Sequence, residues 1–186
     1  MESLVTAFVA AFLCGWGDRT QLLAANLAAG TRRPGQILAG LVLAVLVSNV
    51  AAALAGAWLA PSITLRAMTL LTALALLFAG ISGLIPRRQK PEAPPRWPLV
   101  ATFILCLAAE MGDRVQFLVF AIAGRFGNVP LAVAGATVGL VAACVPAAML
   151  GDRLTTTVPV RGIRWAVAAI MLIAGFITGV KALQLA

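Results

Sequence analysis

The sequence has no histidine, and its three cysteines are isolated from one another. These absences argue against a zinc or copper site, because those ions prefer imidazole and paired thiolate ligands. An odd number of scattered cysteines predicts small buried hydrophobic side chains instead of a disulfide. The cysteines are Cys14, Cys106 and Cys144.

Charge is also scarce in this chain. Only 11% of the residues are charged, 62% are hydrophobic, and the mean hydropathy is +1.02. Such a composition leaves too little polar surface to coat a soluble globular protein, and the apolar segments lack a polar helical face. It predicts an integral membrane protein, and the lack of alternating polar residues favours helices over a β-barrel.

Six apolar runs approach the roughly 20 residues that a helix needs to cross a bilayer. They cover residues 3–28, 36–60, 67–85, 98–124, 129–150 and 165–184. The first run lacks the basic start of a signal peptide, so we expect it to stay in the mature protein. The predicted fold class is therefore all-α integral membrane, with six transmembrane helices.

One short motif occurs twice. Gly-Asp-Arg-Thr-Gln at residues 17–21 returns 95 residues later as Gly-Asp-Arg-Val-Gln at residues 112–116. The same offset aligns other positions, which predicts a duplicated unit. The expected organisation is a first three-helix repeat at 1–86, a cytoplasmic linker at 87–97 and a second three-helix repeat at 98–186. An odd number of helices per repeat inverts the second copy, as in many secondary transporters whose site lies at mid-membrane between the repeats.

The basic residues are spread over short loops, which indicates membrane topology and argues against nucleic-acid binding. If the N-terminus is outside, nine basic residues fall in inner segments and three in outer ones, so both termini are expected outside. The inner residues are Arg32, Arg33, Arg87, Arg88, Lys90, Arg96, Arg153, Arg161 and Arg164, and the outer ones are Arg66, Arg125 and Lys181.

The two motif-bearing runs are longer than a bilayer requires. About 26 residues make a helix of roughly 39 Å, against a hydrocarbon core of roughly 30 Å. Such a helix must tilt or break, and Gly17 and Gly112 are the predicted break points. The alternative is that these glycines allow two helices to cross closely.

Three acids lie within the apolar runs, where a charge costs roughly 2.5 to 3.5 kcal/mol. Glu110 and Asp113 are three residues apart, which predicts a shared helical face that Gln116 continues, and Asp18 and Gln21 repeat the spacing. Carboxylate and amide oxygens suit a hard cation such as Ca²⁺ or Mn²⁺. These five residues are the predicted metal site.

Two arginines accompany the acids. Arg19 and Arg114 are predicted counter-ions that a cation displaces on entry, whereas the alternative makes them permanent ion-pair partners of Asp113 and Asp18 that join helices. Glu110 is the predicted proton carrier, because burial opposes its ionised form while Arg114 favours it.

Thr20 and Asn49 are predicted accessory residues. Thr20 supplies a hydroxyl inside the first motif. Asn49, next to Ser48 in the second run, could reach the cavity, although hydrogen bonding between helices is the stronger expectation for it.

The motif strings Trp-Gly-Asp-Arg-Thr-Gln at 16–21 and Glu-Met-Gly-Asp-Arg-Val-Gln at 110–116 resemble the twin Glu-x-Gly-Asp-[Lys/Arg]-[Ser/Thr] signatures of the Gdt-type family. The resemblance covers essentially the whole chain. It implies a secondary transporter that exports Mn²⁺ or Ca²⁺ in exchange for protons, is not an enzyme, and needs no cofactor. It also implies a bacterial plasma membrane location, with lipid, metal cation and protons as partners, and leaves a homo-oligomer open.

The chain departs from the family pattern at Gly15, where the first glutamate belongs, and at Val115, where the second hydroxyl belongs. Three acids and two arginines then carry a formal charge of −1, whereas the full pattern carries −2 and matches a divalent cation. Export of a monovalent cation or another small solute is therefore an alternative. Two more are an enzyme acting on lipid-linked phosphate, with the motif arginines binding the anion and an aspartate as base, and a structural membrane subunit.

Overall fold

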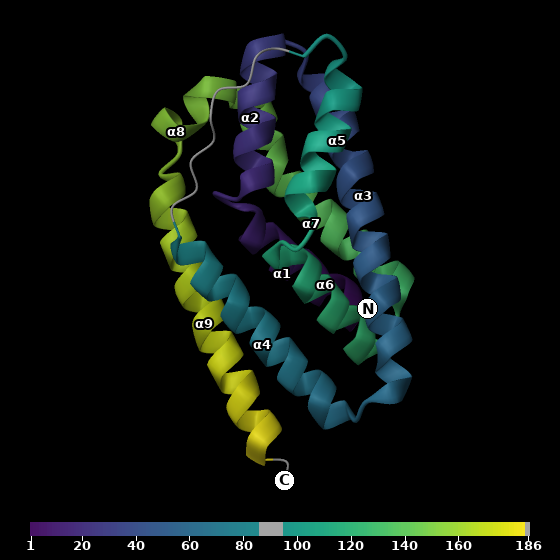
Figure 1. Cartoon of the computed structure of the whole chain (residues 1–186). Helices are drawn as coiled ribbons and strands as arrows, with labels where there is room; N and C mark the ends of the chain where they lie inside the picture. Colours follow the sequence, from purple (N-terminus) through teal and green to yellow (C-terminus); the bar gives the residue numbers. More distant parts are fainter. Residues whose placement is uncertain (86–94, 185–186) are drawn as a thin grey trace.

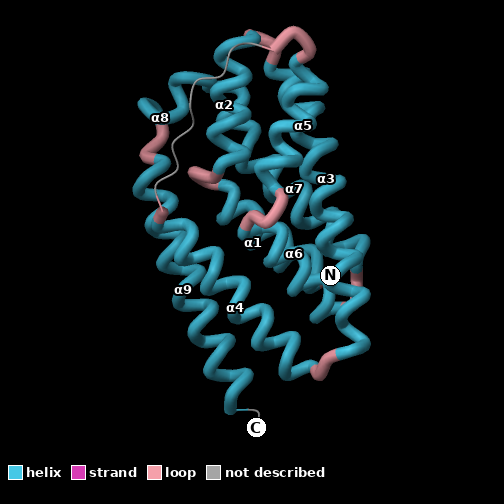
Figure 2. The backbone as a smooth tube through the Cα atoms, viewed as in Figure 1, coloured by secondary structure: helices cyan, strands magenta, loops and turns pink. Residues whose placement is uncertain are grey.

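The computed structural model describes residues 1–85 and 95–184, and these residues form helices joined by short turns (Figures 1 and 2). The predicted linker falls largely on residues 86–94, outside the described part. The helices are α1 (Glu2–Gly15), α2 (Arg19–Thr31), α3 (Pro34–Leu59), η1 (Ala60–Ser62), α4 (Leu65–Leu84), α5 (Pro98–Glu110), α6 (Arg114–Phe126), α7 (Val129–Leu150), η2 (Gly151–Arg153), α8 (Leu154–Thr157) and α9 (Val160–Gln184).

Four of these segments are long and apolar enough to cross a membrane. They are Pro34–Ser62, Leu65–Leu84, Val129–Leu150 and Val160–Leu183, and they match the second, third, fifth and sixth apolar runs of the sequence. The first and fourth runs are each divided into two short helices, α1 with α2 and α5 with α6. The all-helical prediction is thus confirmed, and the long apolar helices indicate an integral membrane protein.

The order of helices repeats at the 95-residue offset of the motif. Helix α2 begins at Arg19 and α6 at Arg114, and α4 begins at Leu65 and α9 at Val160. In Figure 1, α3 descends through the view while its counterpart α7 rises, and α4 and α9 lie side by side in opposite directions. These two pairs of equivalent helices therefore run in opposite directions.

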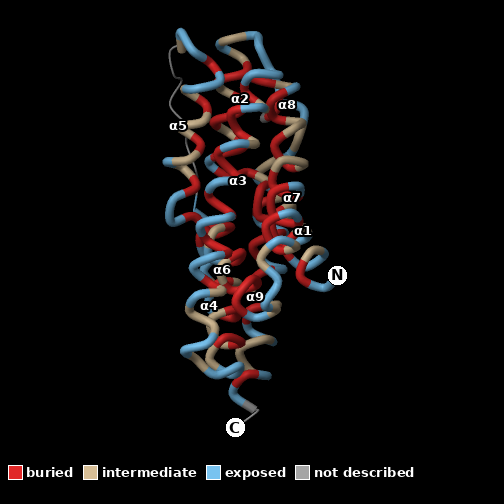
Figure 3. Tube along the Cα trace, turned by 90° about the vertical axis from the view of Figure 1, so that its right-hand side faces the viewer, coloured by how far each residue is buried: buried red, intermediate tan, exposed pale blue. Residues whose placement is uncertain are grey.

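The two halves are packed into each other. Helix α1 lies against α7, α5 lies against α3, and α4 lies against α9, so the main contacts of each half are with the other. Buried residues follow the middle of the molecule where these helices meet, whereas the outer faces are exposed (Figure 3). Neither half could bury its apolar faces in this way alone.

Glycines make these crossings close. A Cβ on Gly40 of α3 would lie 2.5 Å from the carbonyl oxygen of Leu99 in α5, and one on Gly135 of α7 would meet the carbonyl oxygen of Leu4 in α1. Gly135 lies 95 residues after Gly40, and Leu4 lies 95 residues before Leu99. The duplication has therefore preserved the close approach of two helices, which only a residue without a side chain permits.

We expect Gly135→Ala to destabilise the protein by about 1–3 kcal/mol, because the added methyl group must push α1 away from α7. Gly35→Ala is the matched control, since a Cβ there meets nothing within 4 Å. Thermal unfolding of both variants in detergent measures the difference. Equal melting temperatures would show that the crossing is looser than described.

Candidate functional site

The two interrupted helices place the motif in two equivalent turns. Helix α1 ends at Gly15 and α2 begins at Arg19, and the intervening Gly17 has a φ of +68°. In the second copy, Gly112 has a φ of +74°. A residue with a side chain rarely adopts this left-handed conformation, so both turns require glycine. The predicted break points are confirmed.

A glutamine closes each turn. The N–H of Gly17 donates to Oε1 of Gln21 at 2.8 Å, and the N–H of Gly112 donates to Oε1 of Gln116 at 2.8 Å. These bonds satisfy backbone groups that the break would leave unpaired within a membrane, where each such group costs several kcal/mol.

The same glutamines connect each turn to the long helix of the other half. Nε2 of Gln21 donates to the carbonyl oxygen of Ala143 at 2.6 Å, and Nε2 of Gln116 donates to Oγ of Ser48 at 3.4 Å. This role was not predicted from the sequence, although the Gly-x-x-x-Gln spacing in both motif copies could have indicated it. The metal-ligand role of the two glutamines stays a prediction, and it would require their oxygens to leave the turns.

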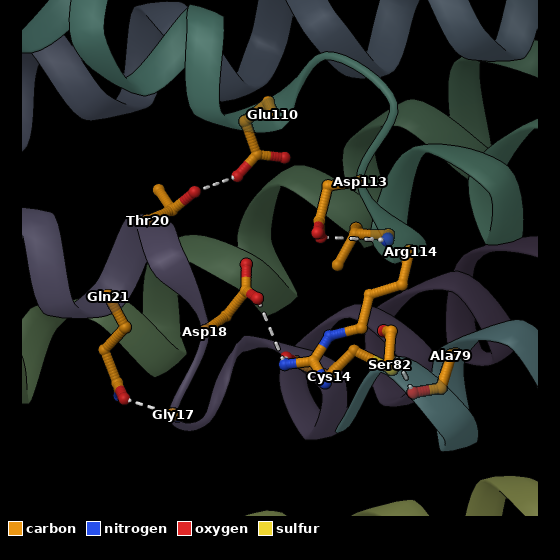
Figure 4. A network of polar contacts seen from close by, with 11 residues as sticks. Cys14, Gly17, Asp18, Thr20, Gln21, Ala79, Ser82, Glu110, Asp113 and Arg114 are labelled. Atoms are coloured by element: carbon orange, nitrogen blue, oxygen red, sulfur yellow. Dashed lines mark hydrogen bonds and ion pairs between the residues drawn. The ribbon is translucent and has the colours of Figure 1, made fainter. Parts of the chain in front are cut away.

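The three acids lie at the breaks. Asp18 is the N-cap of α2, Asp113 is the N-cap of α6, and Glu110 is the last residue of α5. Their exposed fractions are 1%, 6% and 0%, respectively. The break separates Glu110 from Asp113, so the expectation that they share a helical face is wrong. The turn brings them together instead, and Figure 4 shows all three carboxyl groups directed toward one space between the two breaks.

Each acid has a different set of partners. Oδ1 of Asp18 lies 3.2 Å from Nη2 of Arg114, and Oδ2 of Asp113 accepts a bond from the N–H of Val115 at 3.4 Å. Oε1 of Glu110 accepts a hydrogen bond from the hydroxyl of Thr20. Oε2 of Glu110 is buried and has no hydrogen-bond partner among the described residues. A bare carboxylate oxygen in this setting is suited to receive a proton or a cation.

The two motif arginines occupy different environments. Arg114 is 2% exposed, and its Nη2 also donates to the carbonyl oxygen of Cys14 at 2.5 Å, whereas the side chain of Arg19 is exposed. Arg114 is thus a buried counter-ion, whereas Arg19 reaches the surface of the protein. The three acids and Arg114 carry a formal charge of −2.

Asn49 lies next to Ser48 in α3 and is fully buried. Its Nδ2 donates to Oγ1 of Thr137 in α7 at 3.1 Å, which is the expected bond between helices. Its Oδ1 has no hydrogen-bond partner within the described part of the chain. Asn49 thus joins α3 to α7 through its amide nitrogen, and its amide oxygen Oδ1 remains as an acceptor.

Arg164 is a buried residue that sequence reasoning placed in an inner loop. It lies in the first turns of α9, is 9% exposed, and its Cβ and Cδ come within 3.3 Å of the position of a Cβ on Gly17. Helix α9 therefore covers the first break. No sequence signal identified this contact, because Arg164 lies outside both motif copies and far from Gly17 along the chain.

The position of the missing glutamate is filled by packing. A Cβ on Gly15 would lie 2.7 Å from Cβ of Ala143 and 2.9 Å from Cδ1 of Leu140, both in α7. The glycine is therefore required by the crossing of α1 with α7. In this structure the neighbouring helix occupies the space that an acidic side chain at position 15 would need.

The arrangement is an ion pair flanked by two further carboxylates. Within residues 1–85 and 95–184, no three carboxylate, thiol or imidazole groups are close enough to hold a metal ion directly. Movement of Arg114 away from Asp18 would free a carboxylate beside Glu110 and Asp113. The site could therefore exchange the guanidinium group of Arg114 for a cation at Asp18.

Comparisons with known proteins agree with this geometry. The family model described as divalent cation/proton antiporter GDT1 matches residues 3–91 and 98–185, which are the two halves of the chain. A protein of Vibrio cholerae serotype O1 named "Putative manganese exporter" is 30% identical over 187 residues, covering 96% of this chain and 90% of that protein. No solved structure matches. The chain therefore belongs to the divalent cation/proton antiporter GDT1 family.

Proposed function

We propose that this protein exports Mn²⁺ or Ca²⁺ in exchange for protons through the site formed by Asp18, Glu110 and Asp113. The observation that carries the proposal is the convergence of three buried carboxyl groups on one space, where Asp18 forms an ion pair with Arg114. Oxygen ligands of this kind suit a hard divalent cation. The name of the Vibrio cholerae relative makes Mn²⁺ the first ion to test.

The charge of the site supports a divalent substrate. With Arg19 exposed, the three acids and Arg114 carry −2, which one divalent cation or two protons would neutralise. The monovalent alternative depended on a charge of −1, which required both arginines to lie inside. Arg19 is exposed, so solvent screens its charge more strongly than that of the buried Arg114.

The architecture proposed for transport is six membrane crossings arranged as two inverted three-helix repeats. Each pair of short helices, α1 with α2 and α5 with α6, makes one broken crossing, and the opposite directions of α3 and α7 support the inversion. Rocking of one half against the other opens the site to each side in turn. The proposed location is a bacterial plasma membrane, which the family resemblance implies, and the asymmetry of the basic residues supports both termini outside.

The ion pair between Arg114 and Asp18 provides a means of coupling metal movement to proton movement. In the conformation described, Arg114 neutralises Asp18, and an entering cation replaces its guanidinium. The repeat equates Arg114 with Arg19 and Asp18 with Asp113, so the proposal extends the same role to Arg19 and Asp113. Protons compete with the metal for Glu110, whose Oε2 has no other partner among the described residues.

Proteoliposomes containing the purified protein, a metal-sensitive dye and a pH-sensitive dye test the proposal. We expect inward Mn²⁺ movement to accompany outward proton movement, with less response to Ca²⁺ and none to Na⁺. Protein-free vesicles measure leakage. Transport of Na⁺ at the rate of Mn²⁺, or metal flux without any proton flux, would refute the proposal.

A further inference from the structure

A cavity of about 500 Å³ lies between α4, α6 and α9, far from the acidic site along these helices. It is at the end of the molecule where α4 begins and α9 ends, at the bottom of Figure 1. Arg66, Arg125 and Lys181 line it, one from each helix. Residues far apart in the sequence thus bring three positive charges to one cavity.

Among the residues that the structure describes, no acidic side chain lines this cavity. The partial negative charge of helix C-termini offsets part of this positive charge. Nε and Nη2 of Arg66 donate to the carbonyl oxygens of Ala182 at 3.1 Å and Leu183 at 3.4 Å. Arg125 and Lys181 lie in the last turns of α6 and α9. Each helix C-terminus is equivalent to about −0.5 charge, so two ends offset about one of the three positive charges. A charge of about +2 is left for a ligand to neutralise.

The walls of the cavity are apolar on the side that faces away from the protein. Leu65 is 72% exposed and Ile177 is 49% exposed, and both belong to helices long enough to cross a membrane. The hydroxyls of Thr69 and Thr178 already donate to carbonyl oxygens of their own helices, at 2.9 and 2.7 Å. Binding would therefore depend on the cations for charge and on the aliphatic side chains for apolar contact.

We propose that this cavity binds the phosphate group of an anionic phospholipid, with the acyl chains lying along Leu65 and Ile177. Arginine and lysine form charge-assisted hydrogen bonds with phosphate oxygens, and basic pockets between transmembrane helices are suited to lipid headgroups. If α4 and α9 cross the membrane along their length, their ends at this cavity reach the headgroup layer. The bound lipid holds α6 against the α4–α9 pair.

Thermal unfolding of the full chain in neutral detergent tests this site, with phosphatidylglycerol, phosphatidylcholine of the same acyl length, or inorganic phosphate added. We expect phosphatidylglycerol to raise the melting temperature by about 5 °C when in large excess over its Kd. Phosphatidylcholine and inorganic phosphate should leave it unchanged. Native mass spectrometry should show one phosphatidylglycerol bound per chain.

The variant that removes two of the charges, Arg125→Gln with Lys181→Gln, should lose both the shift and the bound lipid. Arg66 is retained in it because Arg66 holds the end of α9. The charge-matched control is Arg32→Gln with Arg33→Gln, two exposed residues outside the cavity, which should keep both. An equal shift with phosphatidylcholine, or one that survives in the cavity variant, would overturn the proposal. A shift reproduced by inorganic phosphate would overturn its assignment to lipid.

Discussion

Glu110→Gln is expected to lower Mn²⁺ flux by more than about 10-fold, since even residues that only support a metal ligand contribute about 10–100-fold to metal affinity. Glutamine keeps the size of the side chain and an oxygen for Thr20, but it loses the charge and cannot carry a proton. Flux and proton movement in the same proteoliposomes measure both losses.

Glu2→Gln is the matched control for this experiment. Glu2 is an exposed acid at the start of α1, outside the site, so its variant should transport as well as the unaltered protein. Asp18→Asn and Asp113→Asn should behave as Glu110→Gln does for metal flux. Full transport by either aspartate variant would favour the structural interpretation of the buried charges.

Arg114→Gln is expected to destabilise the protein by about 3–5 kcal/mol, because it leaves Asp18 buried without its ion-pair partner. Arg19→Gln, at the equivalent position in the first motif, should change stability by less than about 0.5 kcal/mol because that side chain is exposed. Thermal unfolding in detergent compares the two variants directly. The same substitution at equivalent positions of the two motif copies is thus expected to give very different results.

A double variant separates the effect of losing the ion pair from the effect of losing the other contacts of Arg114. If Asp18 is the group left unpaired, Asp18→Asn should restore much of the stability lost in Arg114→Gln. The hydrogen bond from Arg114 to the Cys14 carbonyl stays broken, so recovery should be incomplete. Additive losses in the double variant would show that Arg114 acts through contacts other than Asp18.

Much of the fold was predictable from hydrophobic length alone. The apolar runs 36–60 and 129–150 correspond to α3 and α7 within a few residues, because in lipid an apolar segment of that length must be helical. The breaks were also predictable, since runs 3–28 and 98–124 exceed the bilayer thickness and each has a glycine before its acid.

The arrangement of the side chains within the site was harder to predict from the sequence. Arg19 and Arg114 both follow a Gly-Asp pair and stand two residues before a glutamine, yet one is exposed and the other buried. What distinguishes them is tertiary: the Arg114 guanidinium reaches the carbonyl of Cys14 and the carboxylate of Asp18, both in the other half. Helical periodicity also misplaced Glu110 and Asp113, because it assumed that the helix continues through Gly112.

The contact of Gly15 with α7 limits how far the two halves remain interchangeable. Gly15 and Ala143 stand 95 residues from Glu110 and Ser48, so one helix crossing is built twice from different residues. A carboxylate cannot return to position 15 by a single substitution, because α1 would first have to move away from Ala143. A chimaera assembled from two copies of residues 98–184 would carry the acid twice, but would lack the glycine that lets α1 cross α7. Each half therefore supplies at this crossing a residue that the other half does not have.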